Sequence, residues 1–178
     1  MPESVIVAVW GGSSSNAYST LEEVNEFINT RVFDHSEWEA LSKIQKEAAI
    51  LEATRDIDAG SYVGGLYSVD QALVFPRAFS GGRLQDSVAR EGLLSGSHMQ
   101  SRMERDVKEA LAYQANWIAR SAGRNFHAEN QAQGIKSYSE SVGPIREQYT
   151  YGAAVRRLCP EAAAKVSTWA ESKKIFRG

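Results

Sequence analysis

The stretch MERDVKEALAYQANWIARS, Met103–Ser121, decides the fold that this sequence predicts. Its apolar positions return every three or four residues, which is the spacing of one face of an α-helix. Gly123 follows the last periodic position and provides a stop signal. We therefore predict a helix from about Met103 to Ser121. The residues of its expected buried stripe are Val107, Ala110, Leu111, Gln114, Trp117 and Ile118.

Two more amphipathic helices are predicted upstream. Ser19 and Glu22 have capping-box spacing, so the first helix is expected from about Thr20 to about Val32. Ser36 and Glu39 repeat that spacing, and they predict one long helix from Glu37 to about Asp58, with Gly60 as its stop. The apolar positions of the first helix are Leu21, Val24, Phe27 and Ile28, and those of the second are Trp38, Leu41, Ile44, Ala48, Leu51 and Ile57.

The segments around these helices are expected to be extended or irregular. Within residues 1–17, VIVAVW (Val5–Trp10) is a candidate strand, and GGSSSNA (Gly11–Ala17) is predicted to be a flexible connector. Residues 60–101 are rich in glycine and poorly periodic, which predicts a long loop or arm. Inside that loop an apolar plug ends in a proline that prevents helix continuation. Its residues are Leu73, Val74, Phe75, Pro76 and Arg77.

A polar β-hairpin is predicted at residues 134–152, with a Gly-Pro turn between its strands. Neither face of the hairpin is clearly apolar, so its strands do not fit an ordinary core-facing sheet. The residues that we expect at a contact between subunits or at a channel wall are Lys136, Tyr138, Glu140, Arg146, Gln148, Tyr149 and Tyr151.

The C-terminal part, residues 160–178, is predicted to be a helix followed by a tail. Pro160 can open that helix as its first residue, and a shorter helix is expected before it at Ala153–Leu158. The tail combines apolar and cationic residues, and it either docks on a partner or frays as chain ends do. Its residues are Lys173, Lys174, Ile175, Phe176 and Arg177.

Composition excludes several classes of function. The chain has 178 residues, 43% of them hydrophobic, and a net charge of -2, which fits one soluble domain (1–178) without a strongly basic surface. No apolar run is long enough to span a membrane. The three histidines lack metal-ligand spacing, and the single cysteine, Cys159, has no evident catalytic base, so we expect a buried thiol, no cofactor and no enzymatic activity.

Five segments in this order resemble a known family. They are NAYSTLEEVNEFI (16–28), KEAAILEATRDID (46–58), ALVFPR (72–77), ERDVKEALAYQA (104–115) and SESVGPIREQY (139–149). Together they resemble the tailed-phage head–tail connector, or head-completion adaptor, proteins, whose sequences often carry the label DnaT-like single-stranded-DNA-binding protein. The stretch 80–101 and the helix after Pro160 are longer than is usual for that family.

The resemblance implies a mainly α fold, a small bundle of about four to five helices with a protruding antiparallel hairpin and an extended loop and C-terminal arm. It also implies a ring, usually dodecameric, in the virion neck. Such a ring binds the portal protein and a tail or further adaptor (stopper) protein, and it lets double-stranded DNA pass without sequence-specific binding. It would be made in the bacterial host cytoplasm and would touch no membrane. The tail (173–177) would be the portal-binding segment.

Two other functions remain open. Arg146 and Tyr149 could stack and hold bases, as in a single-stranded-DNA-binding replication accessory protein. A structural role explains the same residues: the tyrosines pack against neighbouring subunits, and the arginines face solvent or the carboxylates of a partner. A phage-encoded enzyme is a third, weaker alternative, because no nucleophile–base pair or metal set is visible.

Overall fold

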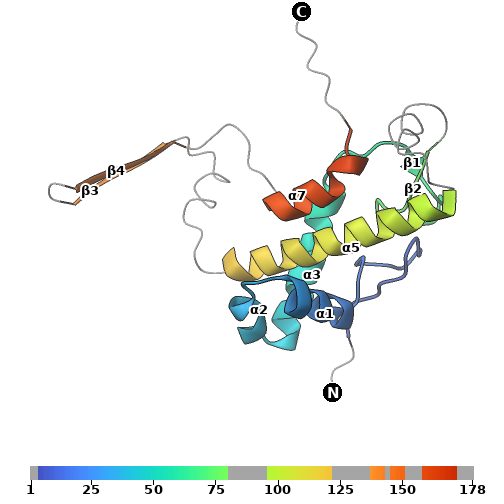
Figure 1. Ribbon diagram of the computed structural model, residues 1–178, viewed down its shortest axis with the longest axis horizontal. Helices are drawn as coiled ribbons and strands as arrows, with labels where there is room; N and C mark the ends of the chain where they lie inside the picture. The colour runs from blue at the N-terminus through green and yellow to red at the C-terminus, as the bar shows by residue number, and fades with distance from the viewer. Residues whose placement is uncertain (1–3, 80–95, 122–136, 143–144, 151–157, 172–178) are drawn as a thin grey trace, which may run out of the picture.

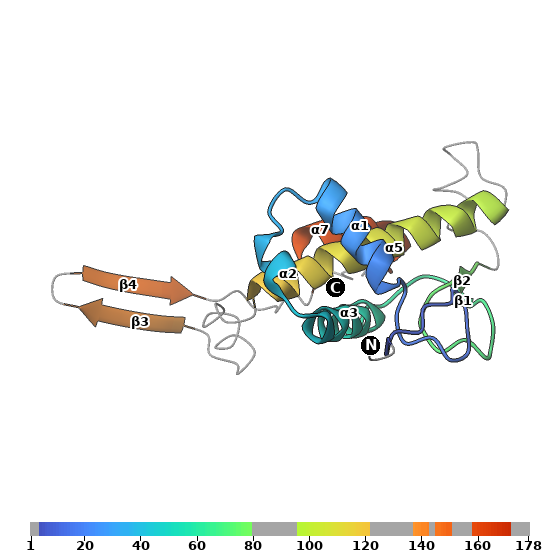
Figure 2. The same cartoon turned by 90° about the horizontal axis from the view of Figure 1, so that it is seen from below.

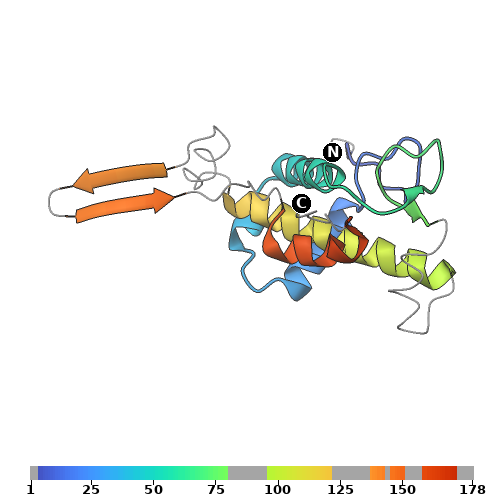
Figure 3. The ribbon, with the colours of Figure 1, turned by 90° about the horizontal axis from the view of Figure 1, so that it is seen from above.

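The computed structural model of this protein describes residues 4–79, 96–121, 137–142, 145–150 and 158–171. Its central element is α5 (Gly96–Ser121), which runs along the helical body (Figure 1). Figures 2 and 3 show the other helices gathered around α5. These helices are α1 (Leu21–Arg31), α2 (Ser36–Ala40), α3 (Lys43–Asp58) and α7 (Pro160–Val166), which continues into the 3-10 turn η1 (Ser167–Trp169). The predicted mainly helical fold with an antiparallel hairpin is confirmed.

α1 has the apolar face that its sequence predicts, but a different cap. Leu21, Val24 and Ile28 are buried. The capping box is made by Thr20 and Glu23, not by Ser19 and Glu22: the Thr20 hydroxyl accepts from the Glu23 N–H at 3.2 Å, and Glu23 Oε2 accepts from the Thr20 N–H at 3.0 Å. The predicted box lay one residue too early because two overlapping Ser/Thr–Glu pairs have the same spacing.

The predicted long helix 37–58 is two helices. Leu41 is extended, and Ser42 begins α3 with its own capping box, in which Gln45 Oε1 accepts from the Ser42 N–H at 2.9 Å. This break shifts the helical phase, so Ile44 is 72% exposed instead of buried. Ala48 is exposed as well. The side of α3 that enters the core contains Ala49, Ile50, Ala53 and Ile57.

α5 begins at Gly96, seven residues before the predicted start, so the end of the predicted loop 60–101 is helical. Within that loop, β1 (Gly65–Leu66) pairs antiparallel with β2 (Arg77–Ala78). Of the predicted stripe of α5, Val107, Ala110, Leu111 and Gln114 are buried. Trp117 and Ile118 are only partly buried against the core.

The N-terminal segment differs from both predictions made for it. Val5–Val9 forms no strand with the described residues, Trp10 lies in a turn, and Val5, Val7 and Val9 are exposed. The expected flexible connector is fixed, because the Ser15 hydroxyl and the Asn16 amide bind the backbone of Val9 and Val7. Hydrogen-bonding side chains therefore replace a partner strand along this segment.

The C-terminal helix starts as predicted, with Pro160 as its first residue. Trp169 is fully buried, and Cys159 is 3% exposed, which confirms the expected buried thiol. Cys159 also caps α7, because its Sγ accepts from the Ala162 N–H at 3.5 Å. The helix predicted at Ala153–Leu158 and the tail Lys173–Arg177 lie outside the described residues, except for Leu158. No helix in the described ranges has the length and apolar character that a membrane crossing requires.

Candidate functional site

The hairpin arm, β3 (Ser137–Val142) with β4 (Ile145–Thr150), extends away from the helical body. Figures 1, 2 and 3 all show the hairpin arm beyond the C-terminal end of α5, and all the helices lie on one side of it. Its strands pair with each other in antiparallel register inside the predicted range 134–152. Two of the expected contact residues, Lys136 and Tyr151, lie outside the described residues.

The strand register divides the arm into two unlike faces. Tyr138 stands opposite Tyr149, and Val142 stands opposite Ile145. Residues that stand opposite each other in an antiparallel pair share a face. The face that holds these two pairs also holds Glu140 opposite Glu147; the other face holds Ser137, Ser139, Ser141, Arg146, Gln148 and Thr150. The sequence alone shows neither face as apolar, but the register brings the aromatic and aliphatic residues of both strands together.

The predicted plug is part of the core of the body. Phe75 is 1% exposed, and its ring lies 6.0 Å from that of Tyr18 and 4.6 Å from that of Tyr62, centroid to centroid. Pro76 is buried, whereas Leu73 and Val74 are partly buried against the core. The plug therefore packs within the 60–79 loop, through Tyr62, and attaches this loop to the segment before α1, through Tyr18.

Arg77 fixes the loop after the plug. Its guanidinium donates to the backbone carbonyl of Val63 at 3.2 Å, to that of Tyr62 at 3.0 Å and to that of Gly64. Through these contacts the side chain of Arg77, which is in β2, binds the backbone that leads directly into β1. Arg77 is thus a structural residue of the body. Its guanidinium binds these backbone carbonyls and not the phosphates of a nucleic acid.

Asp58 joins the end of α3 to the plug. Its carboxylate accepts from the Tyr18 hydroxyl and from the Val74 N–H. Burial raises the pKa of Asp58 above its usual value, although these two hydrogen bonds oppose the shift. Burial, together with the Asp58 charge, raises the pKa of Tyr18 and of Tyr62 far above the usual range, so both tyrosines stay protonated.

Replacing Asp58 with alanine is expected to lower the free energy of unfolding by about 2–3 kcal/mol, because the Tyr18 hydroxyl and the Val74 N–H lose their acceptor. The folded-state pKa of Asp58 lies above the unfolded one, so its ionisation opposes folding and its contribution to stability grows as the pH falls from neutral. Urea titrations at several pH values measure both effects. Asp70→Ala, at an exposed carboxylate, is the matched control. An equal loss of stability in Asp58→Ala and Asp70→Ala would show that the Asp58 hydrogen bonds do not stabilise the fold.

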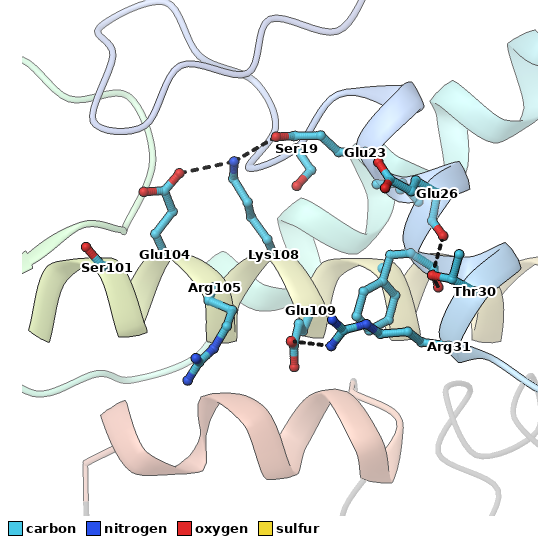
Figure 4. Close-up of a pocket in the computed structure, with 13 residues that line it drawn as sticks. Ser19, Glu23, Glu26, Thr30, Arg31, Ser101, Glu104, Arg105, Lys108 and Glu109 are labelled. Carbon is cyan, nitrogen blue, oxygen red and sulfur yellow. Dashed lines mark hydrogen bonds and ion pairs between the residues drawn. The ribbon is translucent and has the colours of Figure 1, made fainter. Parts of the chain in front are cut away.

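A groove of about 450 Å³ lies between α1 and α5 (Figure 4). Lys108 Nζ contacts Glu23 Oε1 at 2.9 Å and Glu104 Oε1 at 3.1 Å, so it links the two helices. Glu109 receives Arg31 Nη1 at 3.4 Å from one side and Lys165 of α7 from the other. Because these cations are neutralised by carboxylates, the groove is a charged seam between helices and does not offer a phosphate site.

The groove predicts a measurable pKa shift at Glu23. Burial opposes ionisation of Glu23, but hydrogen bonds from Lys108 and Thr20 outweigh it and hold the pKa below its usual value. Lys108→Met is expected to raise that pKa and to reduce stability at neutral pH by less than about 1 kcal/mol, because the pair is half exposed. The stability difference should vanish as the pH falls through the folded pKa of Glu23.

Carbon-detected NMR titration of the Glu23 carboxyl measures this shift directly. Arg105→Met is the control, since Arg105 also lines the groove but pairs with Asp106. An identical Glu23 titration in wild type and Lys108→Met would contradict the interhelical link.

Exposed apolar residues form a signal that the sequence patterns did not identify. Phe33 is 103% exposed, and Val69 is 92% exposed in the loop that follows β1. Val5, Val7 and Val9 of the N-terminal segment are 63%, 40% and 60% exposed. Only a tertiary structure separates these positions from core positions of equal hydrophobicity.

Comparison with protein families gives a match over residues 8–175 to the family described as "Putative DnaT-like ssDNA binding protein". Neither the curated proteins nor the solved structures gave a match. The match agrees with the label attached to the sequence resemblance, and it favours single-stranded-DNA binding over a connector role. The assignment to phage connectors stays a prediction. Because the match covers nearly the whole described chain, this protein belongs to the DnaT-like ssDNA-binding protein family.

Proposed function

We propose that this protein is a structural adaptor of a phage head–tail connector, which assembles through its hairpin arm into a ring below the portal. The observation that carries the proposal is the arm itself, a two-stranded ribbon that extends from the body with both outer edges clear of the described helices (Figure 1). An isolated two-stranded ribbon is marginal in water. Pairing with a neighbouring copy would stabilise the ribbon and cover its edges.

The charges of the body support a channel wall better than a DNA grip. Phosphate contacts dominate the affinity of proteins for DNA, so a wall along which DNA slides should present few free cations. In the body, Arg31, Lys108 and Lys165 are paired with carboxylates, as are Arg102 and Arg120. Double-stranded DNA would then pass without sequence-specific binding, and the protein would need neither a catalytic group nor a cofactor.

The remaining partners follow from this role. The protein would reside in the virion neck after synthesis in the host cytoplasm, with the portal on one side and a tail or stopper protein on the other. The tail Lys173–Arg177, which lies outside the described residues, is the proposed portal-binding segment. The subunit number that the resemblance implies is twelve, as in a dodecamer.

Single-stranded-DNA binding is the second candidate function, and the family match favours it. Its chemical support is that β4 contains both Arg146 and Tyr149, since aromatic and cationic residues on a ribbon can stack on bases and neutralise phosphates. In this reading the face of the arm that holds Tyr138 and Tyr149 is a stacking platform instead of a subunit contact.

One pair of measurements separates the two functions. Electron microscopy of the chain mixed with its cognate portal should show rings if the adaptor role is right, and no co-assembly would contradict it. Fluorescence anisotropy with a labelled oligothymidylate at low salt should stay flat. Salt-sensitive binding that is lost in Tyr149→Ala and Arg146→Ala, but kept in the exposed control Tyr67→Ala, would instead establish the DNA-binding role.

A further inference from the structure

The N-terminal segment Val5–Val9 has one edge that is hydrogen-bonded by its own chain at Val5, Val7 and Val9. The Val7 N–H donates to Asn16 Oδ1 at 2.8 Å, and the Val7 carbonyl accepts from the Asn16 N–H at 2.9 Å. The Val9 N–H donates to the Ser15 hydroxyl at 3.1 Å, and the Val5 carbonyl accepts from Asn16 Nδ2 at 2.8 Å. Every second residue is thus paired, as along one edge of a β-strand.

The opposite edge of the same segment is open. The backbone groups of Ile6 and Ala8 face away from the paired edge, because those of alternate residues in an extended chain point in opposite directions. Among the described residues, the Ala8 N–H and the carbonyls of Ile6 and Ala8 have no hydrogen-bond partner. The Ile6 N–H reaches only the Ser4 hydroxyl next to it, at 3.3 Å. Such a row of groups is a template for a further strand.

The side chains of the segment fit the same conclusion. Ile6 packs against the core, whereas Val5, Val7 and Val9 are 63%, 40% and 60% exposed on the other side. An extended segment with β-branched residues along one side and an open backbone edge is the arrangement that β-strand addition uses.

We infer that the open edge of Val5–Val9 receives a strand of the hairpin arm from a second copy of this chain. The six-residue strands of the arm match the length of the five-residue segment, whereas β1 and β2 have two residues each. The arm face with Tyr138, Tyr149 and Ile145 would adjoin the exposed valines. Aromatic and β-branched residues on neighbouring strands form favourable pairs.

The placement of the two parts favours a contact between different copies. Figures 1, 2 and 3 show the arm at one end of the molecule, and the N-terminal segment, drawn in dark blue, near β1 and β2 at the other end. In this arrangement the length of α5 lies between the arm and the N-terminal segment of the same chain. A contact between two unlike patches is head-to-tail, and when its rotation closes it generates a ring. This inference rests on the proposed adaptor function and adds the acceptor surface.

Two variants test the acceptor edge. Ala8→Pro removes the N–H that the added strand would use, while the paired edge at Val7 and Val9 is untouched. Val7→Lys leaves every backbone group in place and puts a charge among the exposed valines. We expect each variant to raise the concentration for half-assembly by about tenfold or more, measured by mass photometry with and without the cognate portal. Ile44→Lys, which replaces an exposed apolar residue on α3, is the matched control and should assemble like wild type.

A crosslink identifies the two partners. In a Cys159→Ser background, a short bismaleimide should join Val7→Cys of one copy to Glu147→Cys of another when the two variants are mixed, because Glu147 is on the same face of the arm as Tyr149 and Ile145. When Ile44→Cys takes the place of Val7→Cys in the mixture, the crosslinked dimer should not form. Circular dichroism and the melting temperature verify that each variant is folded, and if Ala8→Pro is not folded the test stands on Val7→Lys and the crosslink.

The outcomes separate this inference from the function on which it rests. Assembly that needs the arm but is unchanged in Val7→Lys, with no crosslink above the Ile44→Cys control, would overturn the acceptor surface alone. Assembly that survives removal of the arm, or a chain that remains monomeric with and without the portal, would overturn both.

Discussion

Replacing Phe75 with alanine is expected to lower the free energy of unfolding by about 3–5 kcal/mol, because a fully buried aromatic side chain leaves a cavity when it is truncated. The Phe75 ring is 1% exposed and lies between the rings of Tyr18 and Tyr62. The backbone N–H of Phe75 also donates to the Tyr18 hydroxyl at 3.3 Å. Loss of the ring therefore loosens the packing of the plug against Tyr18 and Tyr62.

Phe33→Ala is the matched control for that variant. The two residues are chemically identical, but Phe33 is 103% exposed, so its removal should change stability by no more than about 0.5 kcal/mol. Chemical denaturation followed by circular dichroism compares the two variants. A loss of less than about 1 kcal/mol in Phe75→Ala would mean that the plug is not part of the core.

Removal of the arm is the second change with a large expected effect. Replacing residues 137–150 with a short Gly-Ser linker should abolish self-assembly and portal binding as a ring. The melting temperature of the remaining body should change little, because the core that the structure describes is built from residues of the body. Sedimentation velocity and thermal denaturation of the same samples measure both quantities.

A control variant keeps the arm but alters only its polar face. Ser139→Thr retains a hydroxyl on β3 and should assemble as wild type does. If the body without its arm melted far below the wild type, the arm would be a stabilising part of the fold, and the assignment of assembly to it would lose its basis.

The sequence predicted helices well where the apolar period was uninterrupted. The stripe Val107, Ala110 and Leu111 of α5 is buried as expected, and so are Leu21, Val24 and Ile28 of α1. Prediction was wrong where a local signal competed with the period. Ser42 and Gln45 form a capping box inside an apolar pattern that continues through Leu41 and Ile44, and the box divides the predicted helix.

The candidate site was less accessible to prediction, since it depends on contacts between distant segments. The two faces of the arm follow from its register, which sets Tyr138 opposite Tyr149, and a single strand does not contain that information. Val5–Val9 reads as a strand from its β-branched residues, but Asn16 and Ser15 take the place of its partner on one edge. Neither side-chain bond has a sequence signature that separates it from an ordinary polar turn.

Electron microscopy of the full-length chain with its cognate portal tests the central claim most directly, namely that copies of this protein join through the arm. The account predicts closed rings in which the arm of each subunit crosses to the next and lies along its N-terminal segment. Subunits bound singly, with each arm free of its neighbours, would contradict it.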